Sequence, residues 1–230
     1  NTSLGDNYLV GCGMYDITGP AAEVIFFGYV NMKQEAKGIH DRQWARAFII
    51  VDPLTNERVV FVNCDLGAIF YPVVREVAKR LQGMYGNLYT DRNMVISATH
   101  THCAPGGHSH HPLYNGSTKG YIDQNFEAIV EGTVQSIARA HNNLAPGKVF
   151  INKGELWDAS INRSVLPYLN NVDALDYPTI DPEMVVLKFM QGSTPVGLIS
   201  WFATHPANFP NTFKYVSSDN KGYASYLFEK

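Results

Sequence analysis

The chain has 230 residues, 45% of them hydrophobic and 12% aromatic, which is enough to bury a sizeable core. Its 18 Lys and Arg residues against 21 Asp and Glu residues give a formal net charge of -3, so no strong positive field favours binding to nucleic acid. No apolar stretch approaches the roughly 20 residues that a membrane-spanning helix needs. Composition therefore indicates a globular domain.

The first half of the chain predicts strands around one helix. Runs 46–52 and 58–65 are rich in β-branched residues and flank the turn "PLTNE", which predicts a hairpin. Segment 71–86 has apolar residues at helical spacing and ends in glycine, as an amphipathic helix packed on a sheet does. Segment 93–100, "NMVISATH", predicts a further strand that ends at a histidine.

The second half continues with both kinds of element. A stripe of apolar residues predicts a long helix over 122–144, and "KVFINKGEL" at 148–156 predicts a strand. Runs 184–190 and 195–205 flank the polar turn "QGST" and predict a second hairpin. The closing segment, 217–230, predicts a helix capped by Ser218 or Asp219, whose pattern runs to the last residue. We expect a layered α/β domain with a mixed β-sheet and flanking helices, incomplete at its C-terminus and without an internal boundary.

Three cysteines, Cys12, Cys64 and Cys103, are widely spaced along the chain. An odd number at such spacing permits at most one bridge and argues against a disulfide framework. We expect free, buried thiols. Cys103 follows two histidines and could be a nucleophile or a metal ligand, but a small buried residue that fills space is the favoured interpretation.

His100 and His102 stand two residues apart at the end of a predicted strand. Side chains two apart on a strand point to the same side, so both imidazoles should face one pocket. His205 also follows an apolar strand, at the kind of sheet end where sites form in open α/β folds. A catalytic zinc site uses about three protein ligands and leaves one position for water, which this set could supply. The alternative is a solvent-facing or hydrogen-bonded pair.

Other candidate residues have simpler explanations. The run "GGHSHHP", with His108, His110 and His111, is interpreted as a polar, mobile entrance loop and excluded as a source of ligands. His40 precedes Asp41, where a salt-linked turn accounts for both residues.

Arg163 lies in a stretch of low charge, where an arginine holds either a specific carboxylate or ligand oxygen, or a surface ion pair. The sequence has no Gly-x-Ser-x-Gly elbow, phosphate-binding loop or dinucleotide fingerprint, which removes the usual hydrolase, kinase and dehydrogenase interpretations.

The N-terminus and three sequons bear on cellular location. The first residue is Asn1 rather than Met, so we expect that any signal peptide or anchor lies upstream. Asn1, Asn115 and Asn162 each begin a glycosylation sequon, which is a weak pattern.

Seven words occur in one order along the chain: "GMYDITGPAAE", "GIHDRQWARAFIIVD", "SATHTH", "PGKVFINKGEL", "INRS", "LISWFATHP" and "SSDNKGYASYL". In these words the chain resembles the neutral ceramidases, over nearly its full length. The resemblance implies hydrolysis of the amide of ceramide (N-acylsphingosine) to sphingosine and a fatty acid, a zinc cofactor, a membrane surface as the source of substrate, and secretion or display on the extracellular face. It also implies that residues 1–230 are the N-terminal portion of one catalytic domain.

The resemblance assigns roles to four residues. His100 and His205 match zinc ligands of the family, whereas His102 and Arg163 match residues that line the active site beside the metal. The family's remaining ligands, a glutamate and a tyrosine, its "GDVSPN"-type serine and a C-terminal β-sandwich are expected beyond residue 230. Isolated residues 1–230 are therefore expected to be inactive. Attack by zinc-bound hydroxide and attack by that serine stay open, with hydroxide favoured.

The chain departs from the family pattern at two places: Cys103-Ala104 replaces the expected Ser-Gly, and the histidine-rich loop that follows is not a motif of the family. These departures bear on pocket shape and substrate preference more than on metal binding. Two other functions remain as alternatives. One is a catalytically inactive lipid-binding domain of the same fold. The other is an unrelated zinc hydrolase that uses His100, His102 and His205 as three ligands.

Overall fold

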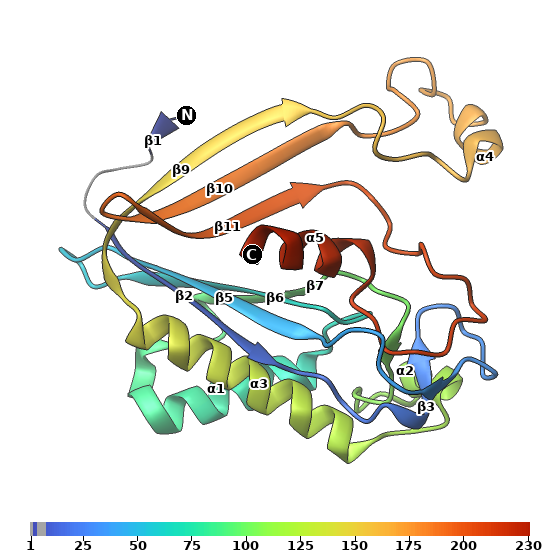
Figure 1. Ribbon diagram of the computed structural model, residues 1–230, viewed down its shortest axis with the longest axis horizontal. Coiled ribbons are helices and arrows are strands. Elements are labelled where there is room, and N and C mark those ends of the chain that lie inside the picture. The colour runs from blue at the N-terminus through green and yellow to red at the C-terminus, as the bar shows by residue number, and fades with distance from the viewer. Residues whose placement is uncertain (1, 4–7) are drawn as a thin grey trace. The chain divides into compact units, whose positions relative to one another are not determined.

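A computed structural model describes residues 2–3 and 8–230. The chain folds into two compact units (Figure 1). The larger unit comprises Leu9–Ala145 and Pro206–Lys230, and the smaller one comprises Pro146–His205 with the described residues that precede Leu9. Within the described residues, no helix is both long and apolar enough to cross a membrane.

A mixed sheet forms the centre of the larger unit. Its strands are β2 (Tyr8–Asp16), β5 (Trp44–Val51), β6 (Arg58–Cys64) and β7 (Met94–Ala98), in that order. β2, β5 and β6 pair antiparallel, which confirms the predicted hairpin, whereas β6 and β7 pair parallel. A parallel pair needs a crossover connection, and helix α1 (Tyr71–Tyr85) provides it. The mixed α/β fold predicted from the sequence is confirmed.

Helix α1 and the long helix α3 (Asp123–Asn142) cover one face of this sheet (Figure 1). Both helices lie where the apolar spacing predicts them. Gly13 on β2 makes the fit close, because a Cβ there would lie 2.4 Å from the backbone nitrogen of Ala140. The core between sheet and helices contains mainly aliphatic residues, among them Ala45, Ala47, Ile49, Val60, Val62, Val73, Val77, Leu81, Ile129, Val130, Val134 and Ile137.

The opposite face of the same sheet carries helix α5 (Asp219–Glu229), the predicted closing helix (Figure 1). The two faces differ because successive side chains of a strand point to opposite sides of the sheet. Ala45 and Ala47 point into the core, while Arg46 between them is bonded to Glu229 of α5. Ser218 occupies the N-cap position as expected, but its side chain does not cap the helix.

A small second sheet lies beside the main one in the larger unit. Its order is β4 (Glu35–Lys37), β3 (Ala22–Phe27) and β8 (Ala104–Pro105), all antiparallel. Val24, Phe26 and Cys103 pack in its apolar core. The remaining short helices of this unit are η1 (Gly86–Leu88), α2 (Pro112–Asn115) and η2 (Gly116–Thr118).

The smaller unit is an antiparallel sheet in which β9 (Ala145–Glu155) pairs with β10 (Glu183–Gln191), and β10 pairs with β11 (Thr194–Phe202). The two-residue strand β1 (Thr2–Ser3) also pairs with β9. Helix α4 (Val165–Leu169) lies in the connection between β9 and β10. The β10–β11 hairpin is the predicted one, but β11 ends at Phe202 rather than at His205.

Candidate metal centre

His100 lies in the loop after β7, in a left-handed backbone conformation with φ of 70°. Its N–H donates to the carbonyl of Leu66 at 2.9 Å. The imidazoles of His100 and His102 face each other, as the spacing predicts. The predicted reason is wrong, because β7 ends at Ala98 and neither histidine belongs to the strand. The left-handed conformation of His100 is sparsely populated for residues other than glycine and is typical of functional sites.

The imidazole of His100 is oriented by a backbone carbonyl. Its Nδ1 lies 2.6 Å from the carbonyl oxygen of Gly67. Because a carbonyl oxygen can only accept, Nδ1 carries the proton and Nε2 presents its lone pair. In most metal-binding histidines, the ring nitrogen that does not bind the metal donates to an acceptor of this kind, which fixes the tautomer. Position 67 requires glycine, because a Cβ there would lie 2.8 Å from the ring of Phe27.

His102 is only 5% exposed and is held on two sides. The ring of Tyr29 packs edge-to-face against it, with 4.3 Å between ring centroids. Gly28 lies directly beside the imidazole: a Cβ on Gly28 would fall 2.6 Å from Cγ of His102. Gly28 also has φ of 133°, a conformation that L side chains rarely adopt. Both constraints explain glycine at this position.

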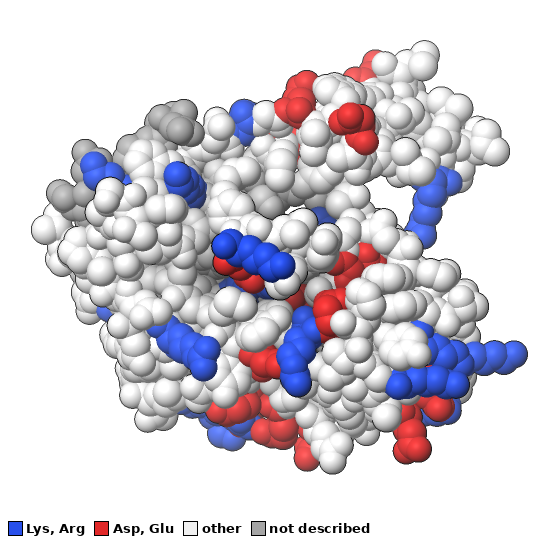
Figure 2. Space-filling model, viewed as in Figure 1, with Lys and Arg blue, Asp and Glu red and all other residues white. Residues whose placement is uncertain are grey.

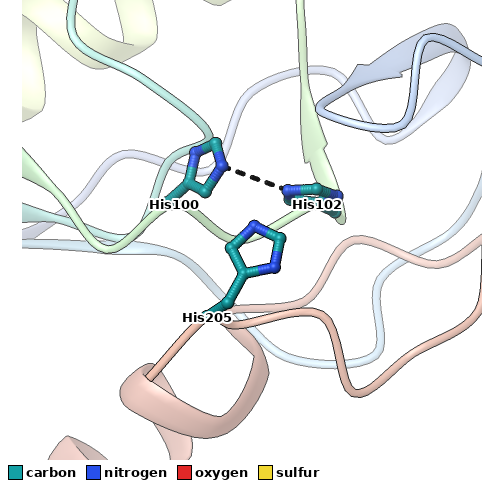
Figure 3. A group of neighbouring side chains, drawn as sticks. All are labelled: His100, His102 and His205. Atoms are coloured by element: carbon teal, nitrogen blue, oxygen red, sulfur yellow. Dashed lines mark hydrogen bonds between the residues drawn. The ribbon is translucent and has the colours of Figure 1, made fainter. Parts of the chain in front are cut away.

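The imidazoles converge. Nε2 of His102 lies 3.2 Å from Nε2 of His100. One ligand atom from each of His100, His102 and His205 lies within 4.8 Å of the others (Figure 3). Two nitrogens that share a tetrahedral metal at about 2.0–2.1 Å are about 3.3 Å apart, close to the observed spacing. The residues present therefore fit a metal ion.

Three imidazole nitrogens suit zinc, copper, iron or nickel. His205 lies three residues beyond the end of β11 and directly before Pro206. The division of roles predicted for the histidines, with His100 and His205 as ligands and His102 as a catalytic group, stays a prediction.

Arg163 is exposed and lies two residues before α4 in the smaller unit. Its predicted catalytic role stays a prediction.

All three cysteines are free, as expected. Cys103 is fully buried, and burial raises the pKa of its thiol to about 12. A thiol that stays protonated at neutral pH is a poor nucleophile, which supports its interpretation as a buried residue that fills space.

The histidine-rich run does not form a uniformly solvated loop. His110 and His111 are exposed, but His108 is fully buried and its Nε2 donates to the carbonyl of Ala68 at 3.0 Å. Burial lowers the pKa of His108 to about 4, so its imidazole is neutral at physiological pH. The prediction of a polar loop is wrong for His108, because its ring packs against Phe70.

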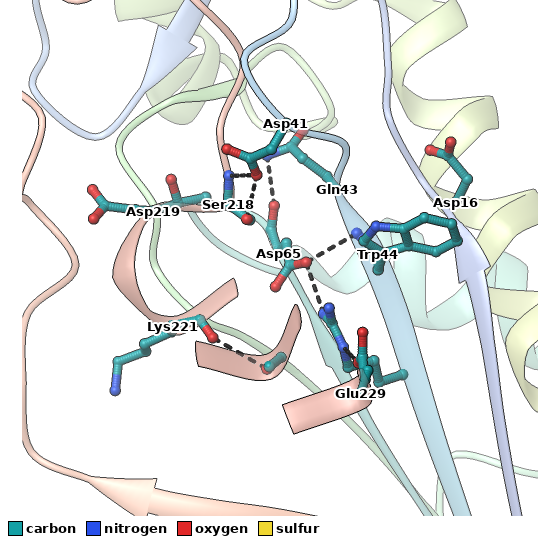
Figure 4. Close-up of polar contacts among 12 residues, drawn as sticks. Asp16, Asp41, Gln43, Trp44, Asp65, Ser218, Asp219, Lys221 and Glu229 are labelled. Carbon is teal, nitrogen blue, oxygen red and sulfur yellow. Dashed lines mark hydrogen bonds and ion pairs between the residues drawn. The ribbon is translucent and has the colours of Figure 1, made fainter. Parts of the chain in front are cut away.

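A buried charged pair went unrecognised in the sequence. Asp65, at the end of β6, is fully buried and accepts from Arg46 at 2.7 Å and from the N–H of Trp44 at 3.0 Å (Figure 4). Arg46 also bonds Glu229 of α5. The available signal was an arginine in the apolar run "WARAFIIV", since a buried charge needs a partner.

Asp41 forms a second polar cluster, of which the salt link with His40 at 2.8 Å was predicted and is confirmed. Its carboxylate also accepts from the hydroxyl of Ser217 and from the N–H of Ser218 (Figure 4). Burial raises the pKa of Asp41, but the hydrogen bonds from Ser217, Ser218 and His40 outweigh it and hold the pKa below its usual value.

The sequons differ in exposure. Asn115 is 7% exposed and its amide donates to the carbonyl of Ser109, so it is a poor acceptor for a glycan. Asn162 is partly exposed, and Asn1 lies outside the described residues.

Charges of both signs are interspersed over the face shown in Figure 2. That distribution agrees with the small net charge and offers no continuous basic stripe on this face for a nucleic acid.

Comparison with known proteins places these features in a family. The family model described as "Neutral/alkaline non-lysosomal ceramidase, N-terminal" matches residues 8–230. Neutral ceramidase of Pseudomonas aeruginosa is 47% identical over 224 residues, and that of Oryza sativa subsp. japonica is 46% identical over 227 residues; each match covers 96% of this chain. The chain spans 33% and 29% of the lengths of these two relatives, respectively.

Solved structures agree with the sequence matches. The crystal structure of the Pseudomonas aeruginosa neutral ceramidase superposes with a TM-score of 0.94 at 47% identity, over 98% of this chain and 36% of that one. A structure described as "Ceramidase complexed with C2" gives the same TM-score and identity, over 98% of this chain and 35% of that one.

Proposed function

The chain belongs to the neutral/alkaline non-lysosomal ceramidase family, and from this premise we propose that it is part of a zinc-dependent amidase that hydrolyses ceramide. The observation that carries the proposal is the convergence of His100, His102 and His205, whose ligand atoms lie within 4.8 Å of one another. The reaction breaks the amide C–N bond of N-acylsphingosine. The hydroxyl of water joins the acyl carbon to give a fatty acid, and the proton goes to the amine of sphingosine.

His100 and His205 are proposed to hold the zinc ion. When bound, zinc would supply a Lewis acid that acidifies water and polarises the amide carbonyl. The contribution of His100 is a pre-oriented lone pair, because the carbonyl of Gly67 keeps the proton on Nδ1. A fixed ligand requires little reorganisation when metal binds.

His102 and Arg163 are proposed to act on the substrate. A buried imidazole against Tyr29 can donate a hydrogen bond to the oxyanion that develops on the amide oxygen. Arg163 would add a second donor with a fixed positive charge. Removing one such donor from an oxyanion site typically costs about 3 kcal/mol of transition-state stabilisation.

The proposed substrate, ligands and cellular location follow from family membership. Ceramide is a membrane lipid, so we propose that the protein takes it from a membrane surface and binds sphingosine and fatty acid as products. The proposed location is secreted or at the extracellular face of the membrane, supported only by the partly exposed sequon at Asn162.

The chain spans about a third of the Pseudomonas aeruginosa relative, so the activity is proposed for a whole protein that includes it. Groups outside these residues are proposed to complete the zinc site. We expect isolated residues 1–230 to bind zinc weakly and to be inactive.

The test is release of sphingosine from ceramide by the full-length protein, with and without a zinc chelator. Chelator-sensitive release that zinc restores is the expected result. A folded, zinc-loaded protein that binds ceramide without hydrolysing it would contradict the proposal and favour the lipid-binding alternative. In the variant Arg163→Met, which removes the proposed donor and its charge, we expect kcat to fall about 100-fold while zinc binding stays unchanged.

A further inference from the structure

The turn that connects β3 to β4 contacts two separate parts of the larger unit. Three of its side chains donate to backbone carbonyls of the segment that follows Pro206: Tyr29 to Phe209 at 2.7 Å, Asn31 to Asn211 at 3.0 Å, and Gln34 to Phe213 at 3.2 Å. Two of the three donors also contact His102.

Gln34 is the donor that joins both parts. It is fully buried, and its Nε2 donates to the carbonyl of His102 at 3.3 Å as well as to that of Phe213. A buried amide is costly unless it is hydrogen-bonded, and Oε1 of Gln34 is buried with no donor among the described residues. Filling space alone would favour an apolar side chain of this size. The two bonds from Nε2 are therefore the physical reason for glutamine at this position.

Tyr29 acts on the ring of His102 rather than on its backbone. The tyrosine ring lies edge-to-face against the imidazole, and the hydroxyl is anchored at Phe209. Gly28 closes the same side, because no Cβ fits between its backbone and the imidazole. The ring of His102 is thus confined by Tyr29 and Gly28 while Gln34 holds its main chain.

We propose that Gln34 and Tyr29 are positioning residues that set the location of the His102 imidazole relative to His100. The inference rests on the proposed function, in which His100 binds the zinc ion and His102 acts on the substrate beside it. The 3.2 Å between the two Nε2 atoms is the quantity that the positioning controls. Neither Gln34 nor Tyr29 is proposed to touch the metal.

The test uses the full-length protein with Co²⁺ as a spectroscopic probe, followed by steady-state kinetics of the zinc form. Gln34→Met keeps the size of the side chain and removes both donors, and Tyr29→Leu removes the ring from His102. Asn31→Ala is the matched control, because it removes a bond of the same kind without reaching His102. Mutation of residues in the outer shell of a metal site typically costs 10–100-fold in metal affinity or activity.

We expect Gln34→Met and Tyr29→Leu each to change the Co²⁺ absorption spectrum and to lower kcat/KM about tenfold or more, with Asn31→Ala within about twofold of the wild type. If Gln34→Met does not fold, the less buried Tyr29→Leu still decides the question. Variants with wild-type spectra and kinetics would overturn the inference alone, as would an equal loss in Asn31→Ala. A wild-type protein that binds no metal would overturn the proposed function and, with it, this inference.

Discussion

At the scale of single residues, the histidines differ in how the fold holds them. His100 is exposed but fixed by the carbonyls of Leu66 and Gly67, whereas His102 is buried and confined by Gly28 and Tyr29. In the proposed function, the exposed His100 can meet an incoming metal ion, and the buried His102 can remain in place while substrate exchanges. The spacing "HTH" predicted that the rings would be neighbours but gave the wrong reason, because the left-handed turn at His100 replaces the strand.

Gly28 provides a direct test of this confinement. Gly28→Ala places a methyl group against the ring of His102 in a backbone conformation that alanine rarely adopts. We expect a loss of about 1–3 kcal/mol in the free energy of unfolding and a fall in kcat/KM of about tenfold or more. Thermal unfolding and steady-state kinetics measure the two effects. The account would be contradicted if Gly28→Ala matched the wild type in both.

The buried His108 makes stability depend on pH. Its pKa is about 4 in the folded protein and about 6.5 in the unfolded chain, so the unfolded chain binds the proton more tightly. The stabilising contribution is fully present above about pH 6.5 and is lost as pH falls towards 4, in total about 3 kcal/mol.

His108→Phe removes this titration. The stability of the wild type relative to His108→Phe should therefore decline between pH 6.5 and pH 4, as followed by calorimetry. His111→Ala, on the exposed part of the same loop, is the control and should keep the pH dependence of the wild type. A constant difference between wild type and His108→Phe across this range would rule out a buried neutral His108.

At the scale of elements, the charged group at Arg46 links α5 to the main sheet. Arg46 pairs with Asp65, directly after β6, and with Glu229, the last residue of α5. Removing one partner of a buried pair leaves an uncompensated charge. The helix therefore depends on a contact that hydrophobic spacing along α5 does not reveal.

Arg46→Met tests that dependence. We expect the free energy of unfolding to fall by about 3–5 kcal/mol, because Asp65 would remain buried without its cation. Arg42→Met removes the exposed pair with Asp16 and should cost less than about 1 kcal/mol. Chemical denaturation compares the two variants. Equal effects would show that burial of the Arg46 pair is unimportant.

Elements with long periodic patterns were predicted well. The β5–β6 hairpin, α1 and α3 lie where the sequence places them, because each buries one continuous apolar face. Ends of strands were predicted less well: β7 and β11 stop before the histidines that follow them. A strand ends where backbone pairing stops, and side-chain hydrophobicity continues past that point.

At the scale of the whole molecule, family membership was predictable, and the division into two units was not. Seven short sequence motifs in fixed order carried the resemblance that the family match confirms. Two of the three unit boundaries, near residues 8 and 146, fall at the starts of β2 and β9, so no loop-rich linker marks them. The third, after His205, lies in the segment between β11 and α5. The supports of His102 were also hidden, since Gln34 and Tyr29 lie about 70 residues away in the sequence and meet it only after folding.

The measurement that tests the central claim most directly is anomalous diffraction at the zinc edge from crystals of the full-length, zinc-loaded protein. The account predicts one strong peak about 2.0–2.1 Å from Nε2 of His100 and from a ring nitrogen of His205. The distance from that peak to His102 will show whether His102 is a third ligand or a neighbouring donor. A peak elsewhere, with none beside His100 and His205, would contradict the account.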